Sequence, residues 1–138
     1  MRLADVDGDG DLDCVETSLD CGYAAWRENC GGANRWKFRP IAGKLHDAYR
    51  FDIGDLNRDG LPDMVVPADG AGGVFVFRNR NKAAAWEVTL LDKHRAGLHW
   101  PNIIHLADIN KDGHLDILAT DWADKAVAWI YQAHRSIR

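Results

Sequence analysis

An aspartate-rich nine-residue pattern, D-x-[DN]-x-D-G-x-x-D, occurs three times along the chain. The copies read DVDGDGDLD from residue 5, DLNRDGLPD from residue 55 and DINKDGHLD from residue 108. Neighbouring carboxylates repel one another by on the order of 1 kcal/mol per pair even in water. A single acidic cluster is compatible with a solvated loop, but three copies of one spacing favour loops that bind a cation.

The oxygen-bearing side chains occupy the first, third, fifth and ninth positions of each copy. They are Asp5, Asp7, Asp9 and Asp13, then Asp55, Asn57, Asp59 and Asp63, then Asp108, Asn110, Asp112 and Asp116. The seventh position varies among Asp11, Leu61 and His114, as expected if only its backbone carbonyl binds the ion. Calcium takes about six to eight oxygen ligands of these kinds, so we predict that these residues hold Ca²⁺.

Calcium loops of the EF-hand type are the competing interpretation. An EF-hand needs a glutamate at the twelfth loop position and a helix on each side. Glu16 meets the first requirement, but Val66 and Ala119 occupy the equivalent positions. Only four residues precede the first loop, and prolines and glycines follow the second, so flanking helices are excluded there.

The segments between the acidic loops are short apolar runs rich in β-branched and aromatic residues, bounded by Gly, Asp, Asn and Pro. Such runs predict strands, and no sustained helical period accompanies them. The acidic loops begin 50 and then 53 residues apart, and the tryptophans at 26, 36, 86 and 129 follow the same spacing. Periods of about this size with four strands each are typical of propeller blades.

The three acidic loops, each followed by a third strand of the kind WREN or VFRN, resemble the FG-GAP and VCBS repeats of integrin α-subunits and secreted bacterial proteins. The resemblance covers nearly the whole chain. It implies a β-propeller with calcium in the loop between the first and second strands of each blade. It also implies an extracellular, cell-surface or periplasmic location, although this chain shows no signal peptide.

We therefore predict an all-β fold, a partial and open β-propeller of about three four-stranded blades. Residues 1–41 form a partial blade without its inner strand, 42–91 a complete blade, and 92–138 a partial blade without its outer strand. Because closed propellers have about 4 to 8 blades, we expect a fragment of a longer protein. Its unpaired strand edges favour association with the remaining blades or with further copies of the chain.

Composition excludes two classes of partner. The 17 basic residues are scattered and the formal net charge is −4, which argues against nucleic acid. No apolar run reaches the 18 residues or so that a membrane span needs.

The sequence offers no catalytic residues. The acidic loops account for the closely spaced aspartates, and the six histidines show no metal-ligand spacing, so no catalytic residues are assigned.

Two functions remain open at this point. The first is a noncatalytic binding or adhesion module with a protein or glycan ligand. The second is the propeller portion of a polysaccharide-cleaving lyase or glycosidase. The repeating tryptophans are interpreted as packing, whereas Trp100 and Trp122 have no repeat partner. They define a candidate ligand surface whose residues are His99, Trp100, Asp121, Trp122 and Asp124.

Overall fold

The computed structural model describes residues 1–48, 50–68, 73–91, 101–121 and 128–132, the last range without its side chains. These residues form eleven strands and no helix, so the all-β prediction is confirmed. The first sheet contains β1 (Arg2–Ala4), β2 (Asp13–Ser18), β3 (Tyr23–Asn29) and β4 (Trp36–Gly43). The second contains β5 (Asp52–Gly54), β6 (Asp63–Ala68), β7 (Gly73–Arg80) and β8 (Ala85–Leu91). The third contains β9 (Pro101–Ala107), β10 (Asp116–Asp121) and β11 (Ala128–Gln132).

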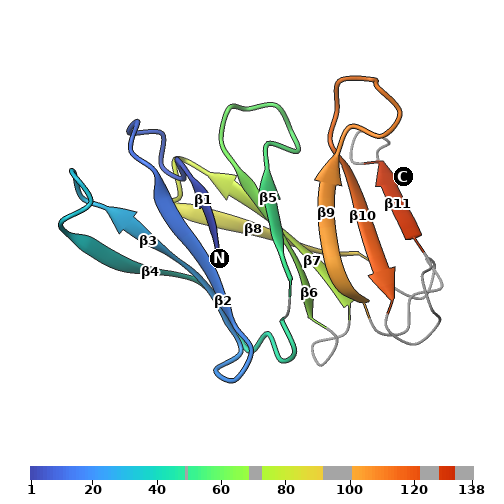
Figure 1. The fold of residues 1–138 in the computed structure, drawn as a ribbon, viewed down its shortest axis with the longest axis horizontal. Helices are drawn as coiled ribbons and strands as arrows, with labels where there is room; N and C mark the ends of the chain where they lie inside the picture. The colour runs from blue at the N-terminus through green and yellow to red at the C-terminus, as the bar shows by residue number, and fades with distance from the viewer. Residues whose placement is uncertain (49, 69–72, 92–100, 122–127, 133–138) are drawn as a thin grey trace.

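Each sheet is an antiparallel meander in which strands adjacent in the chain are also adjacent in space. The three sheets stand side by side, and within the described residues none closes on itself (Figure 1). The acidic loops connect β1 to β2, β5 to β6 and β9 to β10. All three lie at the same end of the molecule, which is the top in Figure 1.

The first sheet has an inner strand, so the prediction that this unit lacks one is wrong. Arg2–Ala4 pairs with β2, and Ala4 lies opposite Asp13. In the second sheet Gly54 lies opposite Asp63 in the same way. Both inner strands are three residues long and end where the acidic loop begins. Four residues before the first loop are therefore enough for this strand.

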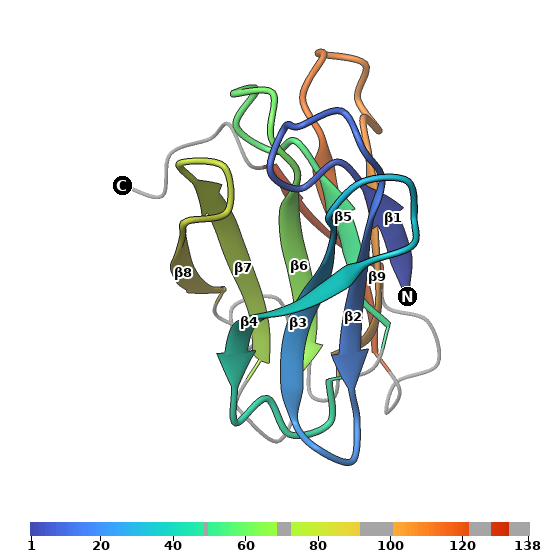
Figure 2. The same ribbon diagram turned by 90° about the vertical axis from the view of Figure 1, so that its left-hand side faces the viewer.

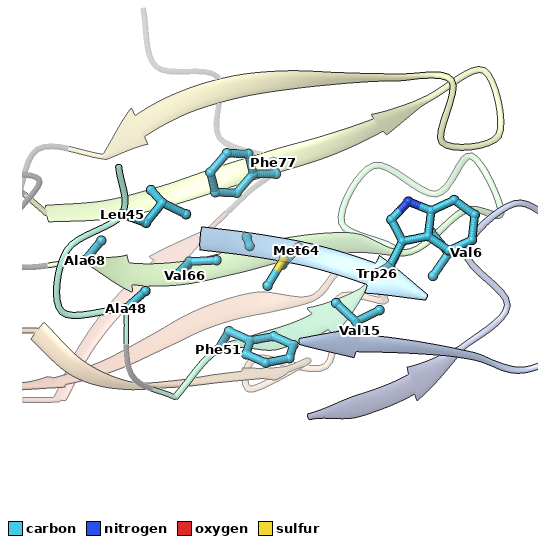
Figure 3. Close-up of a cluster of buried hydrophobic side chains, with 11 residues drawn as sticks. Val6, Val15, Trp26, Leu45, Ala48, Phe51, Met64, Val66, Ala68 and Phe77 are labelled. Carbon is cyan, nitrogen blue, oxygen red and sulfur yellow. The ribbon is translucent and has the colours of Figure 1, made fainter. Parts of the chain in front are cut away.

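Two apolar clusters hold the sheets together. Between the first and second sheets, Val15 and Trp26 pack with Met64 and Phe77 (Figure 3). Between the second and third sheets, the second cluster contains Val65, Val74, Val76, Ile104 and Ile117. All six residues of β6 are buried, which explains why its sequence is apolar at consecutive positions instead of alternate ones.

The inner strands follow one another along one side of the molecule (Figure 2). The Asp52 carboxylate of β5 links them, because it accepts hydrogen bonds from Arg2 Nε of β1 at 3.1 Å and from the Leu106 backbone N–H of β9 at 3.0 Å. A further bond runs from Asn79 Nδ2 of β7 to the Val6 carbonyl in the first acidic loop, at 2.7 Å. These bonds fix the acidic loops relative to one another.

Candidate metal centres

The first-position aspartate closes each acidic loop. In the first loop, Asp5 accepts the backbone N–H of Asp9 at 3.1 Å and that of Gly10 at 3.0 Å. Asp55 and Asp108 accept the equivalent pairs of N–H groups at 2.8 to 3.1 Å. The same local sequence therefore produces the same turn three times.

Aspartate or asparagine at the third and fifth positions tightens the turn further. The third-position oxygen accepts the fifth-position N–H, at 3.3 Å from Asp7 and 2.9 Å from Asn57. The fifth-position oxygen in turn accepts the seventh-position N–H, at 2.8 Å for Asp9. These are Asx turns, in which a short polar side chain bonds the backbone two residues on. The sixth residue has φ of 85° to 97° in all three loops, a conformation that glycine adopts without steric cost.

The ninth-position aspartate is fully buried in every copy. Asp13 accepts the backbone N–H groups of Val6 at 2.9 Å and Asn29 at 2.8 Å. Asp63 accepts the backbone N–H groups of Leu56 at 3.2 Å and Asn79 at 2.9 Å. In the first two copies the carboxylate therefore joins its loop to the third strand of the sheet.

The third copy keeps only part of this arrangement. Asp116 Oδ2 accepts the backbone N–H of Ile109 at 3.0 Å. The other carboxylate oxygen, Oδ1, is buried and has no hydrogen-bond donor among the described residues. A buried acceptor without a donor is costly, so this carboxylate has capacity left for another partner.

Burial makes the charged form of these carboxylates unfavourable. It raises the pKa of Asp63 to about 6, and it also raises the pKa of Asp13. Burial is the main cause of the raised pKa of Asp7 as well, and the charges of Asp9 and Asp13 raise it further. A bound dication would favour the charged forms and lower these pKa values.

The first loop has the geometry of a cation site. Asp5, Asp7 and Asp13 each offer one carboxylate oxygen, and these oxygens lie within 4.8 Å of one another. Calcium–oxygen distances are about 2.3–2.6 Å, so two ligands of one calcium ion lie no more than about 5 Å apart. The donors are all oxygens, which suits a hard cation. These residues therefore fit calcium.

The remaining candidate ligands occupy equivalent places without forming a second cluster of three acidic groups in the described residues. Asp9 and Asp11 share the first loop but lie outside its cluster. In the later loops asparagine replaces the third-position aspartate, and its Nδ2 donates to the fifth-position carboxylate at 2.9 Å. The seventh-position residues Leu61 and His114 present backbone N–H groups to the fifth-position aspartate at 2.9 Å. Their predicted carbonyl ligation stays a prediction.

The ligand surface predicted from unpaired tryptophans lies mostly outside the described residues. His99, Trp100, Trp122 and Asp124 all belong to undescribed segments. Asp121, at the end of β10, is described and is buried, with 6% of its surface exposed. That surface therefore stays a prediction.

Sequence reasoning missed a structural role for two asparagines at the ends of the third strands. The side-chain oxygen of Asn29 accepts the N–H groups of Gly31 and Ala33, at 3.2 and 3.0 Å. Asn79 accepts the N–H of Ala83 at 2.7 Å in the same way. The detectable signal is that both asparagines lie sixteen residues after the buried aspartate of their unit. They shape the turns beside the acidic loops.

Comparison with known proteins identifies one family. The sequence model of the FG-GAP-like repeat matches residues 5–66 and 55–119, so each match spans two successive acidic loops. Searches of curated proteins and of solved structures give no significant match. No helix in the described part of the chain is long and apolar enough to cross a membrane.

Proposed function

Because this chain belongs to the FG-GAP-like repeat family, we propose that it is a calcium-binding segment of a β-propeller that serves as a noncatalytic binding or adhesion module. Three open sheets, each with its acidic loop between the first and second strands, support the propeller assignment. Further blades, from the same or another chain, would complete the ring.

The observation that carries the proposal is the cluster of Asp5, Asp7 and Asp13 within a loop geometry that occurs three times. Magnesium keeps several waters and demands near-octahedral geometry, whereas calcium accepts many protein oxygens in a flexible arrangement. Five aspartates in one loop therefore favour calcium. When bound, calcium would neutralise the loops and hold the sheets in register.

The proposed module works outside the cytoplasm and binds a protein or glycan. Extracellular modules commonly bind calcium with dissociation constants of about 10⁻⁴–10⁻³ M, which suits loops exposed at one end of a sheet array. In this account calcium acts structurally and the ligand is held elsewhere on the surface.

Calorimetric titration with calcium tests the metal assignment. We expect binding heat and a stability increase of about 2.7 kcal/mol for each site whose dissociation constant free calcium exceeds about 100-fold. The Asp59→Ala variant should lose the part of the binding heat and of the stabilisation that comes from the second loop. Asp20→Ala, at an exposed aspartate outside the loops, is the matched control and should titrate like the wild type. Absence of both heat and thermal stabilisation would show that the loops are only acidic turns.

A further inference from the structure

Two tryptophans that occupy equivalent repeat positions differ in their surroundings. Trp86 packs against the first apolar cluster, as the repeat predicts. Trp36, in the first sheet, is 43% exposed, unlike the packing predicted for it. Its indole Nε1 donates to the Ala33 carbonyl at 3.1 Å, which holds the ring over the turn between β3 and β4.

The ring borders a surface hollow of ≈ 630 Å³. Binding pockets for small ligands commonly measure about 300–1,000 Å³. The hollow lies where the first acidic loop, the end of β3 and the start of β4 meet. Its lining consists of Asp9, Glu28, Cys30, Arg35, Trp36 and Lys37.

Two cations, the chain neighbours of Trp36, also line the hollow. Among the described residues neither Arg35 nor Lys37 takes part in an ion pair. Glu28, the cross-strand partner of Lys37, is paired with Arg39 at 2.6 Å. Among the lining residues the two cations then outnumber Asp9, and bound calcium would offset the other aspartates of the first acidic loop.

The cations are specific to the first unit. At the equivalent positions beside Trp86 the chain has Ala85 and Glu87, and Glu87 is paired with Arg80 at 2.6 Å. The ring with basic neighbours is therefore not a general property of the repeat.

The outer face of the first sheet carries a polar pair where the second sheet has apolar residues. Glu16 and Arg27 form an ion pair there at 3.1 Å. Their equivalents in the second sheet, Val66 and Phe77, are fully buried apolar side chains in the first cluster. The surroundings of the hollow are therefore more polar than the equivalent part of the second sheet.

We propose that the hollow beside Trp36 binds an anionic saccharide. The indole ring offers a large flat apolar surface for the C–H face of a sugar ring. Arg35 and Lys37 bind its carboxylate or sulfate, since guanidinium groups match such oxygens with paired hydrogen bonds. This inference rests on the proposed binding function and gives it a site and a ligand class.

The test uses the full chain with calcium present and four short probes: tetragalacturonate, a heparin tetrasaccharide, neutral maltotetraose and tetraglutamate. The first two separate carboxylate from sulfate recognition, the third lacks charge, and the fourth lacks a sugar ring. We expect binding of at least one anionic saccharide and at least tenfold weaker binding of maltotetraose and tetraglutamate.

Variants locate the site. Trp36→Ala and the double variant Arg35→Gln, Lys37→Gln should each weaken saccharide binding at least tenfold. Phe38→Ala is the matched control, because Phe38 lies on the same strand, is 47% exposed and does not line the hollow. It should change binding less than twofold. Circular dichroism checks folding, and the surface double variant remains informative if Trp36→Ala is destabilised.

Three results would overturn the inference: no binding of either anionic saccharide, equal binding of tetraglutamate, or unchanged binding by the folded variants. Equal binding of tetraglutamate would instead identify an acidic-peptide site. Calcium titration of the same samples separates the two proposals. Intact calcium binding without saccharide binding removes only the inference about the hollow, whereas lost calcium binding removes the proposed metal centres.

Discussion

The first and second acidic loops have the same hydrogen-bonded backbone but different charge. The first contains five aspartates and no cation, a formal charge of −5, whereas the second contains three aspartates and Arg58, a formal charge of −2. Asn57 Nδ2 donates to Asp59 Oδ2 at 2.9 Å, a bond that Asp7 cannot make to Asp9. Arg80 also lies 3.9 Å from Asp59.

The comparison separates the positions that form the turn from the positions that determine how strongly the loop binds a cation. The first, fifth, sixth and ninth positions are the same in both copies and make the turn. The third, fourth and seventh positions carry the charge difference, through Asp7 against Asn57, Gly8 against Arg58 and Asp11 against Leu61, and they set how much the loop needs a cation. We infer that the first loop binds calcium more tightly and depends on it more strongly for stability.

The largest effect is expected at the buried aspartate that both loops share. Asp63→Ala removes the acceptor of two backbone N–H groups, those of Leu56 and Asn79. Leaving buried donors unsatisfied costs about 1–3 kcal/mol each, so the loss of unfolding free energy should be about 2–6 kcal/mol for the two donors. Urea unfolding in EGTA measures it.

Asp13→Ala should cost a similar amount, because it also accepts two backbone N–H groups. Asp20→Ala, on an exposed turn, should leave the unfolding free energy unchanged. A loss below 1 kcal/mol for both buried variants would contradict the view that these aspartates hold the two loops in the same form.

Exchanging the third-position residues should reverse the difference between the loops. Asp7→Asn gives the first loop the donor of the second, so the metal-free protein should gain on the order of 1 kcal/mol and calcium should bind that loop about tenfold more weakly. Asn57→Asp should have the opposite effects in the second loop. Calorimetry and thermal melts with and without calcium measure both. If the two substitutions shift affinity in the same direction, the charge explanation fails.

Stability of the metal-free protein should fall as the pH rises through about 6. The folded-state pKa of Asp63 is raised to about 6 from 3.8, so folding favours the protonated carboxyl. The contribution is fully present below pH 3.8 and is lost above the folded pKa, with a change of about 1 kcal/mol between pH 5 and 7. Melts in EGTA measure it.

Asp63→Asn should flatten this pH dependence more than Asp13→Asn does, because burial raises the pKa of Asp63 further. Saturating calcium should reverse the slope, since the ion favours the charged carboxylates. A metal-free protein whose stability rises between pH 5 and 7 would contradict the assigned cause.

The smallest effect concerns the exposed Arg80. Its guanidinium lies 3.9 Å from Asp59 and forms a closer ion pair with Glu87. Exposed pairs of this kind contribute little, so Arg80→Gln should tighten calcium binding by the second loop no more than about twofold. A tenfold change in the dissociation constant would show that this cation, and not Asn57, accounts for the weaker site.

The repeated pattern was enough to predict the strands, the meander order and the place of the acidic loops. Each of these depends on local turn chemistry and alternating side chains, which the sequence displays directly. The short strand β1 was missed, because three residues carry too little periodicity to register as a strand. The hydrogen bond from Asn79 to Val6 joins residues that are 73 positions apart, so no local sequence pattern could predict it.

Trp36 shows the limit of reasoning from repeats. Position 36 repeats at 86, but packing depends on which sheet covers each residue. The second sheet has the first as its neighbour on the side that Trp86 faces, whereas Trp36 remains exposed at the hollow. The sequence did contain one sign of this difference. Arg35 and Lys37 flank Trp36, whereas Ala85 and Glu87 flank Trp86.

Flow dialysis with radioactive calcium tests the central claim most directly, because it counts ions and ranks sites without depending on heat or stability. The account predicts three ions per chain, one bound more tightly than the other two, with only the tightest site weakened by Asp7→Asn. Binding of no calcium up to millimolar concentration, or a tightest site that Asp7→Asn leaves unchanged, would contradict it.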